Sequence, residues 1–228
     1  MRVELLEGVA ASAGTRRAQV LATALDGEPE ARLLEFDADA VPAPDPLQAA
    51  AAVALRADTA AVHDVDGRRW FLRPFNPEPR VIVVGAVHVA QALAALAPPA
   101  GFEVAVVDPR TAWATAERFP GVRLVHAWPD EAFGALGLDA RTAVVTLTHD
   151  PKLDDPALVA ALAAPVFYVG ALGSRRTHAR RVERLAAGGL APSALERIRA
   201  PVGLDLGART PGEIALAILA QVLGALRS

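Results

Sequence analysis

Four side chains with different chemistries stand within five residues in the middle of the chain: Thr148, His149, Asp150 and Lys152. A hydroxyl, an imidazole, a carboxylate and an ammonium group together can perform general acid and base catalysis or ligate a metal. No predicted helix carries two histidines three or four residues apart, so we predict no metal site. The alternative is a turn in which Asp154 or Asp155 caps a helix that begins near Pro156.

A second group of residues follows an apolar run and precedes a predicted helix: Gly170, Gly173, Ser174, Arg175 and Arg176. Glycines let the backbone approach a ligand closely, and the free N–H groups at a helix start attract an anion. We therefore expect a phosphate site here, with Ser174 as the N-cap. Arg176, Arg180 and Arg184 recur every fourth residue on one helix face, which is either a solvated surface or an extension of that site.

The stretch from Val81 to Asp108 has the layout of a nucleotide-binding strand, turn, helix and strand. Gly85 ends the first apolar run, and Asp108 follows 23 residues later, where such proteins hold a ribose hydroxyl. Val87 replaces a glycine that would let a pyrophosphate approach, which weakens the prediction of a dinucleotide site. His88 is either a donor to a bound anion or a residue that caps the helix or packs against the loop.

Asp108 and Arg110 favour different ligands. The carboxylate of Asp108 suits a ribose diol, whereas Arg110 suits an additional phosphate or a pterin phosphate. Alternatively, the two residues form a local ion pair that fixes the turn.

The elements that must position these residues alternate in type from Arg80 onward. We predict strands at 81–84, 104–107, 122–125, 143–147 and 166–169, and helices at 88–97, 156–163 and 175–187. Thr210 with Glu213 predicts a capping box at the start of a last helix. Apolar strands that alternate with helices predict an α/β fold with a Rossmann-like, doubly wound parallel sheet. The loops that carry the polar residues should meet at the carboxyl edge of that sheet.

The first part of the chain is expected to be a small α+β domain. Short apolar segments at 19–25 and 32–36 flank a turn signal typical of a hairpin, and a helix is predicted at 47–56 and a strand at 69–73. Prolines make residues 75–79 a linker. We therefore predict one domain at 1–75 and a second at 80–228.

Composition limits the classes of function. The 228-residue chain is 53% hydrophobic and has a formal net charge of -3, which argues against general nucleic-acid binding. Cysteine is absent, so disulfides, thiolate metal sites and thiol catalysis are excluded. No apolar run reaches the roughly 18 residues of a membrane span, and the first 25 residues lack a signal-peptide layout, so a cytoplasmic location is expected.

Five segments occur in order at natural spacings: GAVHVA, VVDPR, LTHDPKLDDPAL, FYVGALGSRRTHARR and PVGLDLGARTPGEIALAILA. With them, residues 80–226 resemble the XdhC/CoxI family, accessory proteins for xanthine dehydrogenase, carbon monoxide dehydrogenase and related molybdenum hydroxylases. The resemblance implies a chaperone that binds molybdenum cofactor, protects it during sulfuration and passes it to the target enzyme. The first domain departs from the family pattern, because it is short and lacks a glycine-glycine-cysteine segment. Residues 11–15 are at best a remnant of the family's glycine-serine-proline stretch.

The resemblance implies a molybdopterin-type cofactor, in its cytosine dinucleotide form, at the carboxyl edge of the sheet. Expected phosphate contacts are Gly85, His88, Gly170, Gly173 and Ser174. Asp108 would hold a ribose, Arg110 with Arg175 or Arg176 the remaining charge, and Thr148, His149 and Asp150 would line the same crevice. The expected partners are a cysteine desulfurase, a second copy of the chain and a molybdenum hydroxylase subunit.

Two alternatives remain open. One is an NAD(P)-dependent oxidoreductase with His149 or Lys152 as proton donor, favoured by the strand-helix-strand unit and Asp108. The other is a docking module for a molybdenum hydroxylase, with an empty crevice. The sequence favours a non-catalytic role without deciding whether the chain is an enzyme.

Overall fold

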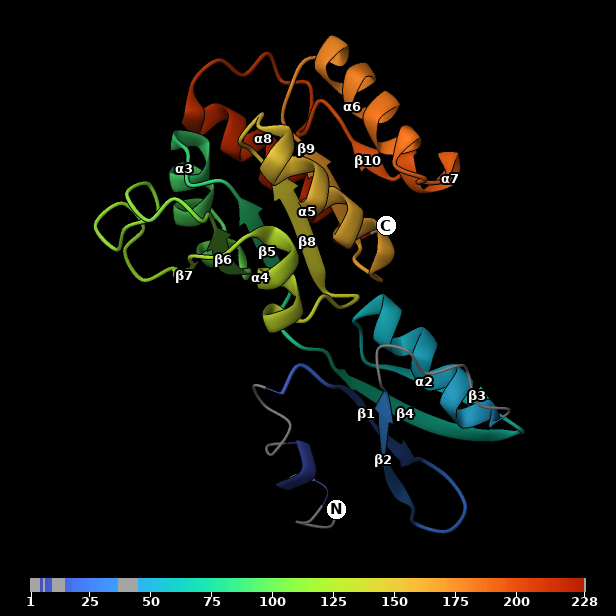
Figure 1. Cartoon of the computed structure of the whole chain (residues 1–228). Helices are drawn as coiled ribbons and strands as arrows, with labels where there is room; N and C mark the ends of the chain where they lie inside the picture. Colours follow the sequence, from blue (N-terminus) through green and yellow to red (C-terminus); the bar gives the residue numbers. More distant parts are fainter. Residues whose placement is uncertain (1–4, 6, 10–14, 37–44, 228) are drawn as a thin grey trace. The chain divides into compact units, whose positions relative to one another are not determined.

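The computed structural model describes residues 5, 7–9, 15–36 and 45–227 and forms two compact units, Met1–Glu78 and Pro79–Ser228 (Figure 1). Residues 11–14, most of the segment compared above with the family's glycine-serine-proline stretch, lie outside the described residues. Among those described, no helix is long and apolar enough to cross a membrane.

The first unit contains a four-stranded antiparallel sheet in the order β2-β1-β4-β3. The strands are β1 (Ala18–Ala24), β2 (Ala31–Phe36), β3 (Ala61–Val65) and β4 (Arg68–Phe75), and helix α2 is Pro46–Ala57. Leu47, Ala51 and Ala54 of α2 share a core with Trp70 and Leu72 of β4. The predicted hairpin, helix and strand are confirmed, but β3 was not predicted, because this short edge strand carries a histidine and an aspartate and is recognisable only from its pairing with β4.

The second unit is built on a six-stranded, all-parallel sheet in the order β10-β9-β8-β5-β6-β7. Its strands are β5 (Arg80–Val84), β6 (Glu103–Val107), β7 (Arg123–Val125), β8 (Thr142–Thr146), β9 (Tyr168–Ala171) and β10 (Ile198–Arg199). Numbered along this unit, the strands follow the 3-2-1-4-5-6 order of a Rossmann fold. The predicted doubly wound parallel sheet is therefore confirmed.

Helices cover both faces of this sheet, as Figure 1 shows. Val81 and Val83 of β5 share a core with α3 (His88–Leu96) and α8 (Pro211–Leu226) on one face. Ile82 and Val84 share a core with α4 (Pro129–Leu136), α5 (Pro151–Ala163) and α6 (Arg175–Ala187) on the other. The four apolar residues 81–84 of β5 are buried, because both faces of the strand are covered, which explains the unbroken apolar run that predicted it. The short elements η1 (Pro98–Ala100) and α7 (Pro192–Leu195) complete the unit.

Helix α5 begins five residues before the predicted start at Pro156. Asp150 is its N-cap and accepts a hydrogen bond from the Lys152 N–H at 2.9 Å, so the prediction that Asp154 or Asp155 caps the helix is wrong. Pro151 and Pro156 both follow an aspartate and both suit the first helical position, and the structure uses Asp150 with Pro151. Asp154 consequently lies inside the helix and is buried.

The capping box predicted at the start of α8 is present. The Thr210 hydroxyl accepts a hydrogen bond from the Glu213 N–H at 3.3 Å, and the Glu213 carboxylate accepts one from the Thr210 N–H at 3.0 Å. Both contacts satisfy N–H groups that have no partner within the helix.

Replacing Thr210 by alanine should lower the free energy of unfolding by about 1 kcal/mol, because one of these N–H groups loses its acceptor. Thr210→Ser is the matched control, because serine retains the hydroxyl. Urea denaturation of the full chain measures both variants. An equal loss for serine and alanine would contradict a capping role.

Candidate functional site

The strand order of the second unit reverses between β5 and β8, and the loops that follow these strands touch. Gly85 has a φ of +106°, and a methyl group added to it would lie 2.3 Å from Cγ2 of Thr148. Only glycine fits both the backbone conformation and this separation. Ligands of Rossmann folds bind at such a reversal, so the contact marks the centre of the candidate site.

Helix α3 begins in the first of these loops without a side-chain cap. Val87 is its N-cap residue and makes no capping hydrogen bond, and His88 is exposed at the first helical position. Uncapped N–H groups at a helix start carry a partial positive charge and favour an anion. The Ala86 N–H, one residue before Val87, points instead to the carboxylate of Asp108, at 2.8 Å.

The Asp108 carboxylate is fully buried and accepts four hydrogen bonds. One comes from the Ala86 N–H, and three come from Arg110: its backbone N–H at 2.9 Å, Nε at 2.8 Å and Nη2 at 2.7 Å. Burial raises the pKa of Asp108, but the hydrogen bonds from Arg110 and Ala86 outweigh burial and hold the pKa below its usual range. The structure thus contains the local ion pair considered as an alternative, and a ribose hydroxyl would have to displace Arg110.

Arg110 in turn lies over an aromatic ring. Its guanidinium carbon is 5.1 Å from the ring centroid of Trp113, close enough for a cation-π interaction. The side chain is therefore held from two sides, by a carboxylate and by an indole. Its predicted contact with a cofactor phosphate stays a prediction.

The loop after β8 is organised around the buried carboxylate of Asp154. This group accepts hydrogen bonds from Oγ1 of Thr148 at 2.6 Å and from the backbone N–H of His149 at 3.1 Å. Burial raises the pKa of Asp154 despite the hydrogen bond from Thr148 and the charge of Arg181. His149 has a φ of +63°, and its side chain is exposed. Sequence reasoning assigned Asp154 only to a helix cap and missed this role.

The loop after β9 brings Gly173 beside His149. Gly173 has a φ of +138°, and a methyl group added to it would lie 3.8 Å from Nδ1 of His149. Ser174 is the N-cap of α6, as predicted, and accepts a hydrogen bond from the Thr177 N–H at 3.2 Å. Arg175 and Arg176 are exposed at the first two helical positions. This part of the predicted phosphate segment therefore lies against the Thr148 loop.

Gly170 lies elsewhere. It belongs to β9 and is buried, and a methyl group added to it would lie 2.5 Å from Cγ2 of Val202 and 2.7 Å from the ring of Tyr168. This glycine is explained by packing within the unit, which the sequence alone did not reveal.

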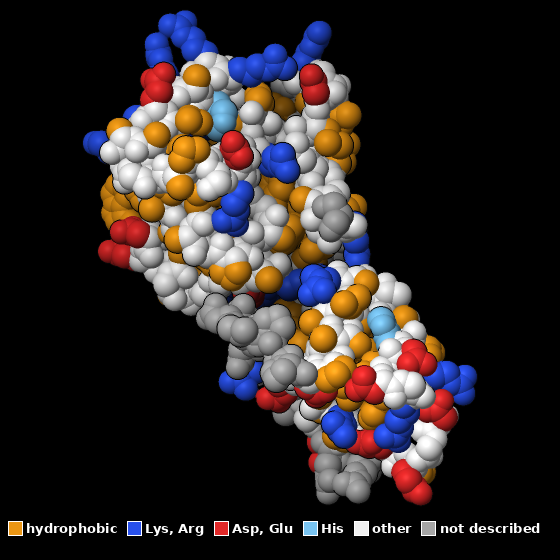
Figure 2. All heavy atoms as spheres, turned by 90° about the vertical axis from the view of Figure 1, so that its right-hand side faces the viewer, with side chains coloured by type: hydrophobic (Ala, Val, Ile, Leu, Met, Phe, Trp, Pro, Cys, Tyr) orange, Lys and Arg blue, Asp and Glu red, His pale blue; other side chains and the backbone are white. Residues whose placement is uncertain are grey.

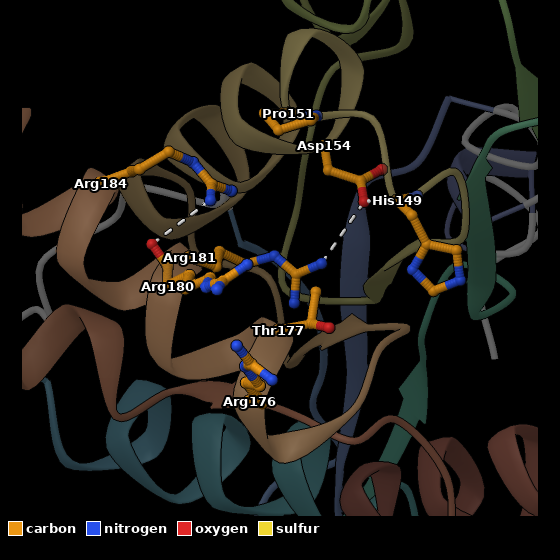
Figure 3. Close-up of a pocket in the computed structure, with 8 residues that line it drawn as sticks. All are labelled: His149, Pro151, Asp154, Arg176, Thr177, Arg180, Arg181 and Arg184. Atoms are coloured by element: carbon orange, nitrogen blue, oxygen red, sulfur yellow. Dashed lines mark hydrogen bonds and ion pairs between the residues drawn. The ribbon is translucent and has the colours of Figure 1, made fainter.

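A cavity of about 200 Å³ lies between the beginnings of α5 and α6 (Figure 3). Its polar lining consists chiefly of six residues: His149, Asp154, Arg176, Arg180, Arg181 and Arg184. Three of the arginines form the predicted stripe, and the fourth, Arg181, is only 2% exposed. In Figure 2, basic side chains gather at the end of the second unit where α6 lies in Figure 1.

No group of three or more histidine, aspartate and glutamate side chains is placed to hold a metal ion within the described ranges. The site instead combines an uncapped helix start, a histidine and several arginines. Such a donor set suits a ligand with more than one anionic group.

Known proteins resemble this chain mainly in the second unit. The sequence pattern of the XdhC Rossmann domain matches residues 81–222. The molybdenum cofactor insertion chaperone PaoD of Escherichia coli K12 is 36% identical over 148 residues, which are 65% of this chain and 40% of that protein. A protein of Bacillus subtilis 168 named as a probable subunit of xanthine dehydrogenase is 34% identical over 154 residues, which are 67% of this chain and 44% of that protein. The chain thus spans less than half the length of these relatives.

A solved structure resembles both units. It is described as a xanthine dehydrogenase from Bacillus halodurans, and the TM-score is 0.58 with 98% of this chain and 96% of that chain covered. The sequences are only 18% identical, so this likeness concerns the fold.

Replacing Gly85 by alanine should lower the free energy of unfolding by about 3 kcal/mol, because left-handed backbone strain adds to the collision with Thr148. Gly101→Ala is the matched control: Gly101 has a φ of +83° with nothing within 4 Å of an added methyl, so it should lose only about 1 kcal/mol. Thermal and urea unfolding measure both variants. Equal losses would show that the Gly85 loop is not locked against Thr148.

Replacing Asp108 by asparagine should lower the free energy of unfolding by about 2 kcal/mol near pH 7, because the buried asparagine amide would place N–H groups against the donors from Ala86 and Arg110. The pKa of Asp108 is depressed in the folded state, so its stabilisation is present above the unfolded pKa of about 3.9 and is lost as the pH falls through the folded pKa. The difference between wild type and variant should therefore shrink below about pH 4. Asp205→Asn, an exposed change of the same charge, should have little effect; a pH-independent difference for Asp108→Asn would contradict the ion pair.

Proposed function

The chain belongs to the XdhC family, and on this basis we propose that it is an accessory protein that binds molybdenum cofactor and assists its sulfuration and insertion into a xanthine dehydrogenase-type molybdenum hydroxylase. The carrying observation is the convergence, at the strand reversal, of the uncapped α3 start with His149 and the start of α6. The names of the relatives, a cofactor insertion chaperone and a probable xanthine dehydrogenase subunit, support the same role.

The proposed ligand is a molybdopterin-type cofactor in its cytosine dinucleotide form. Such a ligand is extended and carries two phosphates, and the site offers two groups of donors for anions. One is the start of α3 with His88, and the other is the start of α6 with Ser174, Arg175 and Arg176. Gly85, Thr148, His149, Asp150 and Gly173 would form the floor between them. The bound cofactor would supply the molybdenum chemistry, and the chain would hold and orient it.

The proposed sulfuration needs a sulfur donor from outside this chain. The sequence has no cysteine that could carry a persulfide, so a cysteine desulfurase is the proposed source. A molybdenum hydroxylase subunit is the proposed recipient. Exposed leucines at positions 216 and 223 of α8 offer an apolar surface for that recipient or for a second copy of the chain.

An NAD(P)-dependent oxidoreductase is less well supported. That interpretation relies on Asp108 as the acceptor for a ribose hydroxyl, and the four donors around this carboxylate leave no free position for one. A dinucleotide with a different sugar contact is compatible with the same geometry.

Calorimetric titration of the full chain with molybdopterin cytosine dinucleotide tests the proposal. The wild type should bind one equivalent, and Arg175→Gln should weaken binding about tenfold, because a charge-assisted contact to phosphate is lost. Arg123→Gln removes the same charge from β7 at the far edge of the sheet and should bind as the wild type does.

The opposite results are equally informative. Absence of cofactor binding, or unchanged binding by Arg175→Gln, would overturn the proposed site. Stabilisation by NAD(H) or NADP(H) alone in a thermal-shift assay would favour the oxidoreductase instead.

A further inference from the structure

Arg181 is a buried cation with too few partners. Its side chain is 2% exposed, and Nη2 donates a hydrogen bond to the Leu172 carbonyl at 2.9 Å. Nε and Nη1 are buried and have no hydrogen-bond partner among the residues that the structure describes. A guanidinium carries five N–H groups, and three of them belong to these two atoms. Burying a charge with unpaired donors costs several kcal/mol, so the arrangement calls for an additional acceptor.

Asp154 is not that acceptor. Its nearest approach to Arg181 is 3.5 Å, whereas a charge-assisted N–H to carboxylate bond is normally about 2.7–2.9 Å. The same carboxylate already accepts hydrogen bonds from Thr148 and His149.

The cavity beside Arg181 carries an excess of positive charge. Arg184 is paired with Asp155, with oxygens 2.8 and 3.0 Å from its nitrogens. Arg176 and Arg180 also line the cavity, and neither forms an ion pair within the described part of the chain. Three arginines therefore face one carboxylate, an excess of two positive charges. Figure 3 shows these arginines on α6 and the carboxylate of Asp154 on α5 around the same space.

We propose that this cavity binds a doubly charged tetrahedral oxyanion, which is flanked by Arg176 and Arg180 and compensates the charge of the buried Arg181 guanidinium in the cavity wall. Its two negative charges match the excess charge of the lining, and its four oxygens match several convergent donors. Two sources share this chemistry, a terminal phosphate ester and free molybdate. The cavity lies between α5 and α6, beside the α6 start that the proposed function assigns to a cofactor phosphate, and it shares Arg176 with that site.

Calorimetry with inorganic phosphate and, separately, with sodium molybdate tests this site in the full chain, in a buffer free of both anions. Each titration should fit one saturable site, and the anion that binds more tightly identifies the source. Arg180→Gln should weaken binding about tenfold, because one of the flanking positive charges is lost. Arg180 is exposed, so this change should not disturb the core. Arg181→Gln should abolish it. Arg209→Gln, an exposed arginine outside the cavity, should leave the affinity unchanged.

Failure to bind either anion would overturn the inference, and so would equal affinity in Arg180→Gln and the wild type. The Arg180 variant keeps the test decisive even where Arg181→Gln does not fold. The inference does not rest on the proposed function, although the two sites share Arg176, and each can fail without the other. If the protein binds phosphate but no molybdopterin, the oxyanion site is supported and the proposed function is overturned. If the protein binds the cofactor but neither anion, the proposed function is supported and this inference is overturned.

Discussion

One buried carboxylate holds the candidate site together. Asp154 lies in the first turn of α5, yet it binds the hydroxyl of Thr148 and the backbone of His149 in the preceding loop. It thereby fixes the loop that touches Gly85 on one side and Gly173 on the other. The same carboxylate faces Arg181 of α6. Three loops and two helices thus take their positions around an acid whose burial is unfavourable unless these donors remain in place.

Sequence patterns predicted the elements whose formation depends on neighbouring residues in the chain, namely the buried strands and the capped helix starts. Unbroken apolar runs identified the buried parallel strands, and Ser174 and Thr210 marked the helix starts that they cap. The start of α5 was misplaced because Asp150-Pro151 and Asp155-Pro156 satisfy the same local rule, so the sequence alone does not choose between them. Short elements such as β10 and α7 were missed, because their existence depends on neighbours distant in the sequence.

The candidate site was predictable in location but not in the task of each residue. Parallel strands gather their loops at one edge, and this rule correctly brought Gly85, Thr148 and Gly173 together. Spacing alone could not reveal that Arg110 turns back onto Asp108, or that Gly170 makes room for Val202. Arg181 stood out least in the sequence, as one arginine among several, because its burial results from the packing of α6 against α5.

The missing side chain at Gly85 has a mechanical consequence. Because the backbone of Gly85 lies directly against the side chain of Thr148, the loop after β5 and the loop after β8 are packed tightly together. A ligand that displaced one loop would also have to displace the other, together with the Asp154 carboxylate that is hydrogen-bonded to Thr148. The two loops at the strand reversal are therefore expected to respond to an arriving molecule as one rigid unit, so recognition there should depend on a preformed shape more than on closure of a lid.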